Sequence, residues 1–449
     1  MSKRLFGTDG IRGKAGEAPL EPVTVRKFGR ALASELCAAG HDRPLVFLAR
    51  DTRESGPWLR DAVAAGLTAG GARASDLGVL PTPGLAYLTR EEHAAAGVMI
   101  SASHNPFADN GLKVFDGTGT KLSDALEAAM EDRILDPSSD DPGESADTPE
   151  AAPHLATRYA EHLGNALADE HGLSGKKVVL DAGHGAAAEW APAIYRGFGL
   201  DVTTIGCEPN GRNINLGCGS LHLEGLAETV RREDAAAGLA FDGDADRCLA
   251  VDARGREIDG DYLLYLLARQ LKRRGTLTGG HVVATIMSNL WLEQQLAAEE
   301  MTLLRAPVGD KYVLETMLDR NAVLGGEQSG HIIYRPAATT GDGILTGLLV
   351  LRCLVEEGRS LAELRDSVEP CPQVLINVPV RDKPDLRRHA VIGPEISRIE
   401  RSMEGSGRVV LRYSGTERKA RVMVEGRDGD AVRAAAETLA DSIRSTIGA

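Results

Sequence analysis

The sequence predicts an α/β protein, because short apolar runs with strand character alternate with amphipathic segments of helical length. The N-terminal part shows this alternation plainly, with an expected helix at Pro22–Ala39, a strand at Pro44–Arg50 and a helix at Trp58–Ala69. Asp51 or Thr52 is expected to cap the second of these helices. Strands that alternate with helices imply parallel sheets covered by helices. The chain of 449 residues has room for about three or four domains.

Changes in composition mark where one domain gives way to the next. The segment Asp136–Pro153 is acidic and rich in Pro and Ser, so we expect a solvated linker there. Past Pro370 the helical pattern weakens, and strands are expected before a terminal helix at Ala431–Ile447. We therefore place the domains at residues 1–153, 154–255, 256–370 and 371–449.

Composition and charge narrow the range of partners. Hydrophobic residues make up 43% of the chain and charged residues 26%, which is ordinary for a globular protein, and the net charge is −14. This negative charge argues against non-specific binding to nucleic acid, and it gives no support for binding to an anionic membrane surface. No apolar run approaches the ~20 residues of a membrane span, and the first residues do not resemble a signal peptide. We expect neither nucleic acid nor membrane as a partner.

The six cysteines are scattered without the spacing of a disulfide framework. We therefore expect reduced thiols in a cytoplasmic protein. Cys207, Cys218 and His222 come nearest to a zinc pattern, but their spacing fits no common zinc site.

A glycine-rich turn at Gly183–Ala188 follows an expected strand and fits the G-x-G-x-x-A pattern of dinucleotide-binding proteins. The acidic residue that should end the second strand of such a unit is missing, because Asp201 stands at the start of that strand. We therefore interpret the glycines as a close turn between a strand and a helix.

The stretch Val98–Val114 is the first that could carry chemistry. A short apolar strand end breaks into a polar loop that holds Ser101, Ser103 and His104, and a second strand follows with Lys113 in it. A serine beside a histidine between two apolar strands is suited to be a nucleophile, since function concentrates on loops. The alternative is a polar turn whose side chains cap the backbone.

An acidic loop, with Asp242, Asp244 and Asp246 at alternate positions, lies between two apolar runs. Three close carboxylates are unfavourable unless a hard divalent cation lies among them. An EF-hand is excluded, because Arg247 and Ala253 occupy the positions where its Gly and Glu would stand. The loop therefore indicates a Mg²⁺ site with room left for a phosphate oxygen, and a solvated acidic turn is the alternative.

Three further loops combine glycines with polar side chains. The opening Leu5–Gly13 could present Arg12 to an anion, and Glu327, Ser329 and His331 could contact sugar hydroxyls or a phosphate. The loop that begins at Arg412 and ends at Arg421 offers hydroxyls, a free amide and several cations, which suit a phosphate. Taken singly, each loop could be an ordinary turn.

Five motifs stand in the order in which they occur in the α-D-phosphohexomutase superfamily, and the chain resembles that superfamily over essentially its whole length. The motifs are Phe6–Gly13, Ser101–Pro106, Asp242–Arg247, Gly326–His331 and Arg412–Glu417. The first motif and the Glu-Gln-Ser sequence of the fourth favour the glucosamine branch. The resemblance implies three related α/β domains with mixed sheets and a smaller C-terminal α+β domain, all around a central cleft.

The resemblance also implies roles for individual residues. Ser103 matches the phosphorylated serine. Asp242, Asp244 and Asp246 match the protein ligands of one Mg²⁺, and an oxygen of phospho-Ser103 completes the metal site. Glu327 and Ser329 match the sugar-binding loop. The residues that match the clamp on the distal phosphate are Arg412, Ser414, Gly415, Thr416 and Arg421. The residues expected around the phosphoserine are Arg12, His104, Lys113, Arg247 and His331.

The activity implied is interconversion of glucosamine 6-phosphate and glucosamine 1-phosphate. It would use a hexosamine bisphosphate as intermediate and activator and would feed UDP-N-acetylglucosamine and cell-wall synthesis. Phosphoglucomutase or phosphomannomutase activity, a non-catalytic phosphosugar-binding protein and a hydrolytic phosphatase are the alternatives. The proton acceptor is Lys113 or His331, because the pKa of Arg247 exceeds ~12. The resemblance is compatible with a homodimer.

Two residues depart from the superfamily pattern. Ala245 stands where a glycine is usual, which is tolerable only if its φ is negative. Arg418 stands where a proline is usual, which removes rigidity and adds a cation near the expected clamp.

Overall fold

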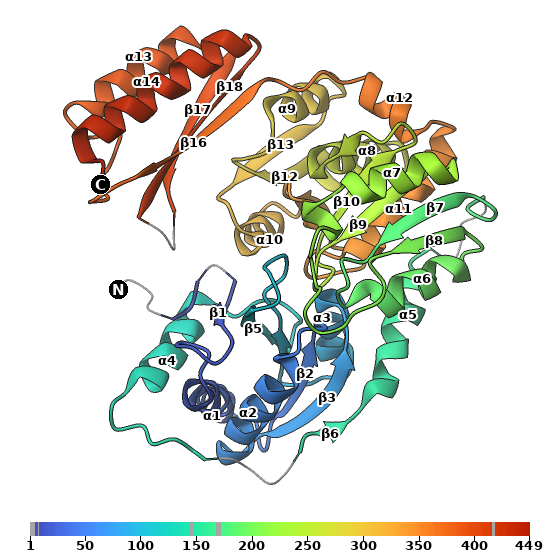
Figure 1. Ribbon diagram of the computed structural model, residues 1–449, viewed down its shortest axis with the longest axis vertical. Helices are drawn as coiled ribbons and strands as arrows, with labels where there is room; N and C mark the ends of the chain where they lie inside the picture. Colours follow the sequence, from blue (N-terminus) through green and yellow to red (C-terminus); the bar gives the residue numbers. More distant parts are fainter. Residues whose placement is uncertain (1–4, 8, 144–147, 168–171, 415–417) are drawn as a thin grey trace.

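The computed structural model describes residues 5–7, 9–143, 148–167, 172–414 and 418–449. Within these residues the strands form four sheets, which follow one another along the chain. Figure 1 shows the four parts in succession around an arc, so that the red C-terminal part returns to the side of the molecule where the chain begins.

The first sheet has the order β1-β5-β4-β2-β3-β6 and is mixed. Its inner strands β2, β3 and β4 are parallel, whereas β5 is antiparallel to β4 and β1 is antiparallel to β5. The strands are β1 (Ile11–Lys14), β2 (Leu45–Arg50), β3 (Arg73–Val79), β4 (Ala96–Ile100), β5 (Asp109–Asp116) and β6 (Glu150–Ala151). The helices of this part are α1 (Pro22–Ala38), α2 (Gly56–Ala69), α3 (Thr82–Glu91) and α4 (Asp124–Leu135).

The segment Asp136–Pro153, which we expected to be a solvated linker, is partly bound to the first part of the chain. Arg26 on α1 donates from Nε to Oδ1 of Asp141 at 2.7 Å, and β6 pairs with β3 at the edge of the first sheet. Residues 144–147 lie outside the described part. An extended segment beside an open sheet edge gains backbone hydrogen bonds when it pairs with that edge as a further strand. The composition of the segment does not predict this pairing, because the bonds are made by the backbone.

The second and third sheets repeat the mixed arrangement, with the orders β11-β10-β9-β7-β8 and β13-β12-β14-β15. The second part contains α5 (Ala156–Asn165), β7 (Lys177–Asp181), α6 (Ala187–Gly197), β8 (Asp201–Ile205), α7 (Glu224–Glu233), β9 (Ala237–Phe241), β10 (Cys248–Asp252) and β11 (Glu257–Ile258), with short 3₁₀ turns at Pro153–Leu155 and Gly219–Leu221. The third contains α8 (Gly260–Arg273), a 3₁₀ turn at Thr278–Gly280, β12 (His281–Thr285), α9 (Leu290–Ala298), β13 (Thr302–Ala306), α10 (Asp310–Asp319), β14 (Leu324–Gly326), β15 (Ile332–Tyr334), α11 (Gly343–Glu357) and α12 (Leu361–Asp366).

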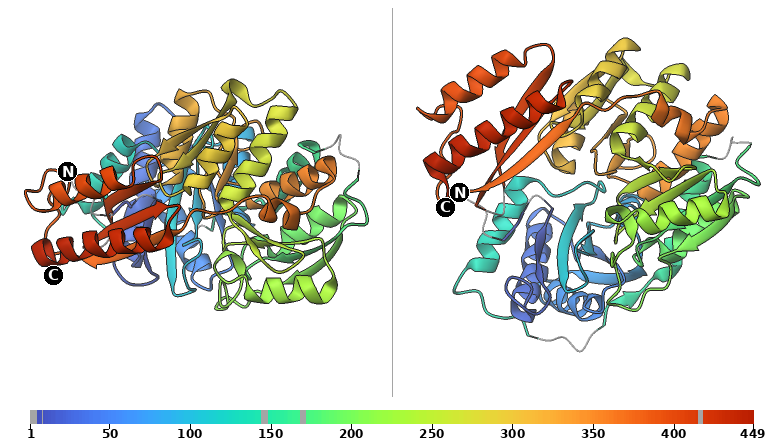
Figure 2. Two further views of the ribbon diagram at one scale, coloured as in Figure 1. Left: turned by 90° about the horizontal axis from the view of Figure 1, so that it is seen from above. Right: turned by 45° about the horizontal axis from the view of Figure 1, so that its top comes forward.

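The C-terminal part is an antiparallel sheet of order β16-β18-β17 with helices packed on one face, as Figure 2 shows in red and orange. Its elements are β16 (Gln373–Pro379), α13 (Ile392–Ser402), β17 (Gly407–Tyr413), β18 (Lys419–Gly426) and α14 (Gly429–Ile447). Three mixed α/β layers followed by a smaller α+β unit confirm the expected fold class.

The hydrophobic cores divide the molecule unevenly. One large cluster runs from Phe47 through Tyr159 and α11 to Cys371, so it joins the first three parts, whereas the C-terminal part has its own core. Polar contacts to the third part hold the C-terminal part in the described structure, among them a hydrogen bond from Nε2 of Gln373 to the carbonyl oxygen of Met287 at 3.4 Å. Asn289 and Cys371 exchange two hydrogen bonds, at 2.9 and 3.2 Å, and Arg408 donates to the carbonyl oxygen of Ser288 at 2.6 Å.

The loops of interest share one position in these sheets. Residues 101–108 (the serine loop) follow β4, residues 242–247 (the metal loop) follow β9, residues 327–331 (the sugar loop) follow β14, and the expected clamp follows β17. Ligands of α/β proteins bind beyond the carboxyl ends of strands.

The described part of the chain contains no helix that is both long and apolar enough to cross a membrane. The six cysteines form no disulfide with one another.

Candidate active site

Ser103 lies in the serine loop with its side chain buried and directed at the metal loop. Its Oγ donates to Oδ2 of Asp242 at 2.5 Å and lies 3.2 Å from Nδ1 of His104. The backbone of Ser103 is left-handed, with φ of 54°, which a residue other than glycine adopts only when its surroundings impose it. Ser101 imposes part of it, because its Oγ accepts the N–H of Ser103 at 2.9 Å. The serine is therefore held in one orientation.

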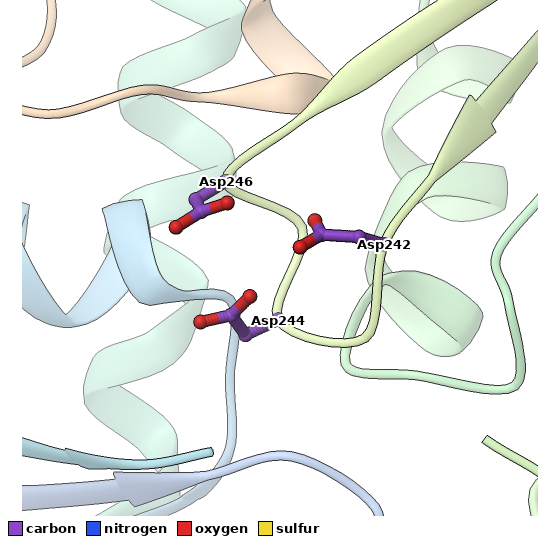
Figure 3. A group of neighbouring side chains, drawn as sticks. All are labelled: Asp242, Asp244 and Asp246. Carbon is purple, nitrogen blue, oxygen red and sulfur yellow. The ribbon is translucent and has the colours of Figure 1, made fainter. Parts of the chain in front are cut away.

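The metal loop brings its three aspartates together, as Figure 3 shows. One carboxylate oxygen from each of Asp242, Asp244 and Asp246 lies within 4.8 Å of the others, and all three side chains are buried. Within the described residues, Oδ1 of Asp244 and Oδ1 of Asp246 are buried without a hydrogen-bond partner. Burial and the negative charges of Asp246 and Asp244 raise the pKa of Asp242 well above its usual value. Buried oxygen donors that repel one another, two of which accept no hydrogen bond within the described residues, fit a divalent cation such as Mg²⁺.

Domain contacts hold the metal loop in place. Thr82, at the start of α3, donates from Oγ1 to Oδ2 of Asp244 at 2.7 Å, and its N–H donates to the carbonyl oxygen of Asp244 at 2.9 Å. The first part of the chain thus orients a carboxylate of the second that could hold a metal ion.

Lys113 reaches the same carboxylates from β5. Its Nζ lies 2.7 Å from Oδ2 of Asp244, 3.3 Å from Oδ2 of Asp246 and 3.1 Å from Oδ2 of Asp9. Burial lowers the pKa of Lys113, but these three carboxylates outweigh burial and hold the pKa well above its usual value. In this arrangement Lys113 is a cation that offsets the acidic loop.

The pKa values of the two histidines are shifted in opposite directions. Burial, and then the charges of Arg247 and Arg12, lower the pKa of His104 to about 4, so its ring is neutral near neutral pH. His331 is enclosed between Asp246 and Asp310, and these carboxylates raise its pKa although burial opposes them. The N–H of Gly341 donates to Nε2 of His331 at 2.9 Å, so the ring takes a second proton only when this bond is given up.

A cavity of about 350 Å³ lies where three of the loops meet. The predicted site residues that line it are Arg12, His104, Arg247, Glu327 and His331, together with the predicted metal ligand Asp246. Glu327 is oriented by the N–H of Gly309, which donates to its Oε1 at 3.2 Å. Ser329 is not among the lining residues, and its Oγ is buried without a hydrogen-bond partner within the described residues. Two arginines, two histidines and four carboxylates, those of Asp9, Asp246, Asp310 and Glu327, thus line the cavity. Such a set of charged and polar groups suits the phosphate and the hydroxyls of a phosphorylated sugar.

The expected clamp is a pair of arginines on neighbouring strands. Arg412 of β17 lies directly opposite Arg421 of β18, and in the described part of the chain the Nε of each is buried without a hydrogen-bond partner. Burial and the charge of Arg421 lower the pKa of Arg412, whereas Glu327 of the sugar loop raises it. Adjacent cations without a carboxylate partner at Nε are typical of an anion site. Ser414 is buried beside them, and its N–H donates to the carbonyl oxygen of Lys419 at 2.9 Å. Gly415 and Thr416 lie outside the described residues.

The expectation of a negative φ at Ala245 is wrong. Ala245 is fully buried with φ of 57°. The turn of the metal loop imposes this conformation: the N–H of Ala245 donates to the carbonyl oxygen of Asp242 at 3.1 Å, and its own carbonyl oxygen accepts the N–H of Gly343 at 2.9 Å. A left-handed alanine costs about 1–2 kcal/mol, which these bonds and the surrounding packing outweigh.

The expected helix cap at Asp51 or Thr52 is also wrong. Helix α2 begins after Ser55, whose side chain makes no capping hydrogen bond. Asp51 instead accepts Oγ–H of Ser101 at 2.7 Å and Nε–H of Arg53 at 2.8 Å, and both Asp51 and Arg53 are fully buried. An Asp and an Arg two residues apart after a buried strand are a signal for such a pair, because a buried charge needs a partner.

The glycines at Gly183–Ala188 form the close strand–helix turn that we expected. A Cβ on Gly185 would lie 2.3 Å from the carbonyl oxygen of Gly243, and the N–H of Ala186 donates to the same oxygen at 2.8 Å. The turn therefore packs directly against the metal loop.

Comparison with known proteins agrees with this geometry. Family descriptions match along the chain: phosphoglucomutase/phosphomannomutase alpha/beta/alpha domain I at residues 3–140, domain II at 157–255, domain III at 259–371 and the C-terminal domain at 375–442. The fold and the site thus define an enzyme of the phosphohexomutase class.

Relatives and solved structures place the chain within that class. It is 47% identical over 451 residues to phosphoglucosamine mutase of Solibacter usitatus, covering 100% of both chains, and 46% identical to phosphoglucosamine mutase of Pseudomonas aeruginosa (strain LESB58), covering 98% of both. The chain belongs to the phosphoglucomutase/phosphomannomutase family.

Two crystal structures share the fold. A phosphoglucomutase/phosphomannomutase family protein from Burkholderia thailandensis is 24% identical with a TM-score of 0.80, covering 98% of this chain and 97% of that one. Aspergillus fumigatus N-acetylphosphoglucosamine mutase, solved with GlcNAc-6P and magnesium, is 18% identical with a TM-score of 0.68, covering 98% of this chain and 96% of that one.

Proposed function

We propose that this enzyme interconverts glucosamine 6-phosphate and glucosamine 1-phosphate through a phosphoryl group carried on Ser103. The observation that supports the proposal most is the hydrogen bond between Ser103 Oγ and Asp242 at 2.5 Å, made where the serine loop and the metal loop meet. The relatives at 46–47% identity, which are named phosphoglucosamine mutase, support the choice of sugar.

Each half of the reaction is a phosphoryl transfer. The bond between phosphorus and Ser103 Oγ breaks while a bond forms to a free hydroxyl oxygen of the sugar monophosphate. That hydroxyl loses its proton to a base, and Ser103 Oγ gains a proton. The hexosamine bisphosphate then turns over within the cleft, and the other phosphoryl group returns to Ser103. Such transfers depend on positioning and on charge stabilisation rather than on covalent chemistry by other residues.

Asp242, Asp244 and Asp246 would hold one Mg²⁺, which would supply positive charge beside the phosphoryl group when it is bound. The cations of the chain itself add to this charge. Lys113 already lies among the aspartates. Arg12 and Arg247 line the cavity, and their buried Nε atoms make no hydrogen bond within the described residues, although Nε of Arg247 lies 3.8 Å from Oδ1 of Asp246. Cationic groups fixed in a site from which water is largely excluded stabilise the charge of the transition state without reorganisation.

The proton acceptor for the sugar hydroxyl is Lys113 or His331. Lys113 is charged while Asp244 and Asp246 surround it, and a cation bound by those carboxylates would lower its pKa. His331 lines the cavity, and its Nε2 already acts as a hydrogen-bond acceptor. Neutral His104, 3.2 Å from Ser103 Oγ, orients the serine.

The remaining site residues bind the substrate in this proposal. Glu327 and Ser329 contact sugar hydroxyls, and Arg412 and Arg421 bind the phosphate that is not being transferred. Ser414, Gly415 and Thr416 complete that clamp. A single clamp of this kind can serve both orientations of the bisphosphate, because either phosphate can occupy it.

We further propose a cytoplasmic enzyme that supplies glucosamine 1-phosphate for UDP-N-acetylglucosamine and cell-wall synthesis. We keep the domain boundaries at residues 153, 255 and 370, and limited proteolysis at these positions tests them. A homodimer is compatible with the proposal, and the mass in solution tests it.

The substrate test compares kcat/KM for the 1-phosphates of glucosamine, glucose and mannose, with Mg²⁺ and a hexose bisphosphate activator present. The proposal predicts the highest value for the amino sugar. Equal or better turnover of glucose 1-phosphate would identify a phosphoglucomutase instead. Steady release of inorganic phosphate would indicate a phosphatase, and binding without turnover would indicate a phosphosugar-binding protein.

A further inference from the structure

Asn215 comes from the second part of the chain but ends at the backbone of the serine loop. It lies in the polar stretch between β8 and the turn at Gly219–Leu221, and it is 9% exposed. Its Nδ2 donates to the carbonyl oxygen of Ser103 at 2.9 Å and to that of Asn105 at 3.1 Å. Asn215 therefore contacts the backbone of Ser103 directly, and a change at Asn215 can reach the Ser103 hydroxyl through that residue alone.

The same two carbonyl oxygens have a second donor from the first part of the chain. Nη2 of Arg53 donates to Ser103 at 3.0 Å and to Asn105 at 2.9 Å. Arg53 also donates to the carbonyl oxygens of Pro106 and Asp109, so it supports the whole loop. Among the described hydrogen bonds, Asn215 reaches two carbonyl oxygens of this segment, those of Ser103 and Asn105, whereas Arg53 reaches four, so the contribution of Asn215 is confined to the backbone next to Ser103.

The peptide groups on both sides of the Ser103 side chain are therefore fixed. The N–H of Ser103 is bound by Ser101, and its C=O is bound by Arg53 and Asn215. Its φ of 54° is unfavourable without such support. Since the position of Oγ follows from the backbone, a loop that relaxes would move Oγ away from Asp242. A displacement of about 1 Å at a reacting group can cost roughly 10²-fold in rate.

Asn215 is itself anchored to the metal-binding part of the chain. Its N–H donates to the carbonyl oxygen of Gly183 at 2.8 Å, and its φ of 57° is one that asparagine tolerates better than most residues. Gly243 of the metal loop lies close enough that a Cβ there would be 3.1 Å from Asn215 Nδ2 and 2.5 Å from the Ser103 carbonyl oxygen. Asn215 thus connects the metal loop to the backbone that carries the nucleophile.

We propose that Asn215 is a positioning residue for phosphoryl transfer, which holds the Ser103 backbone in register with the metal loop. The inference rests on the proposed function of Ser103. Asn215 touches neither the sugar cavity nor the aspartate oxygens in the described contacts, so its loss acts on the transfer step and leaves substrate and metal affinity nearly unchanged.

The test uses the full-length enzyme with Mg²⁺ and a hexose 1,6-bisphosphate as phosphoryl donor. The rate constant for phosphorylation of Ser103 is followed by rapid quench and peptide mass spectrometry, and kcat and KM are measured for glucosamine 6-phosphate. Asn215→Ala removes the donor, and Asn215→Asp keeps the size of the side chain and its tolerance of positive φ but loses the N–H. The second variant serves if the first does not fold.

Asn213→Ala is the matched control. Asn213 lies in the same stretch and its Nδ2 also donates to a backbone carbonyl, that of Glu208 at 2.9 Å, but this contact stays within its own loop. We expect both Asn215 variants to lower the phosphorylation rate constant and kcat by about 10- to 100-fold, with KM within about 3-fold of the wild type. The control is expected to stay within about 2-fold in both.

Wild-type rates in the folded Asn215 variants would overturn the inference. So would a fall in kcat that equals the loss of folded protein while the rate constant for Ser103 phosphorylation in the folded fraction stays at the wild-type value, because a purely structural role lowers only the amount of active enzyme. If the wild-type enzyme itself fails to phosphorylate Ser103, the proposed function fails, and that result is distinct from a specific failure at Asn215.

Discussion

The hydroxyl oxygen of Ser103 lies 2.5 Å from Oδ2 of Asp242, although 139 positions separate the two residues in the chain. Each residue stands in a loop that follows a buried strand, and the strands belong to different sheets. Their meeting depends on the packing of two domains through the shared core. The proposed nucleophile on one domain and a proposed metal ligand on another are thereby brought into one site.

Removing one ligand should abolish the response to the metal. In Asp242→Asn we expect Mg²⁺ to give no increase in melting temperature, whereas the wild type should melt higher as Mg²⁺ is added, since a ligand bound only to the folded state stabilises it. Without metal, the variant should melt above the wild type, because the pKa of Asp242 is raised by burial and by its acidic neighbours. Asp201→Asn, at an exposed carboxylate on β8, is the control. An equal Mg²⁺ response in Asp242→Asn would contradict this assignment.

Loss of either clamp arginine should weaken substrate binding. A hydrogen bond to a charged group contributes about 1.5–3 kcal/mol, so Arg412→Ala or Arg421→Ala should raise KM by roughly 10- to 100-fold. The thermal response to Mg²⁺ should be unchanged, since neither arginine contacts the metal loop in the described structure. Arg388→Ala removes an 89%-exposed cation in the same domain and should leave KM unaltered. Unchanged KM in both clamp variants would show that the distal phosphate binds elsewhere.

The turn of the metal loop should accept glycine but not a branched residue at position 245. In Ala245→Gly, relief of about 1–2 kcal/mol of backbone strain opposes the loss of a buried methyl group, about 0.8 kcal/mol, and the greater entropy of the unfolded chain, about 0.4–1 kcal/mol. We expect a change of less than about 1 kcal/mol in the free energy of unfolding. Ala245→Val should destabilise the protein by more than about 2 kcal/mol, because a β-branched side chain is strained at φ of 57°. Urea unfolding checks both, and a stable Val variant would argue against the left-handed conformation.

Asp261 should make stability depend on pH. It is fully buried at the start of α8 and accepts the N–H of Asn289 at 2.7 Å, while burial and the charge of Asp259 raise its pKa to about 7. A carboxyl group with a raised folded-state pKa binds more protons in the folded than in the unfolded state. The protonated Asp261 carboxyl group therefore contributes fully to the free energy of unfolding below its unfolded-state pKa of about 4. This contribution declines as the pH rises toward the folded-state pKa of about 7 and is lost at higher pH.

The measurement for Asp261 is the free energy of unfolding between pH 4 and pH 8. Asp261→Asn keeps an acceptor for Asn289 but cannot ionise, so the variant should gain stability relative to the wild type by a few kcal/mol at the upper end of the range and little at the lower end. Asp319→Asn, on α10, serves as the control. A difference between variant and wild type that does not change with pH would contradict the raised pKa.

The sequence alone was sufficient for the features that are local. The alternation of strands and helices predicted the α/β class, and the spacing of Asp242, Asp244 and Asp246 predicted a metal site. The structure supports that site, because the three carboxylates are buried close together. Both features depend only on residues close together in the chain, where side-chain periodicity is informative.

What could not be predicted depends on contacts between domains. The hydrogen bond from Thr82 to Asp244 spans 162 positions, and that from Asn215 to Ser103 spans 112. Nothing in the Pro-Thr-Pro sequence around Thr82 or in the polar stretch before Asn215 indicates a distant partner. The sequence did not indicate the positive φ of Ala245 for the same reason, because part of its support is the N–H of Gly343, which lies at the start of α11 in the third part of the chain.

The decisive measurement follows a radiolabelled phosphoryl group from a hexose 1,6-bisphosphate to the protein and then to the sugar. The label should appear on Ser103, as located by peptide mapping, and should pass to the sugar when glucosamine 6-phosphate is added. Ser103→Ala should take up no label, whereas Ser101→Ala should still be labelled at Ser103, more slowly. Label on Ser103→Ala, or label that leaves phospho-Ser103 only as inorganic phosphate, would contradict a mutase that works through this serine.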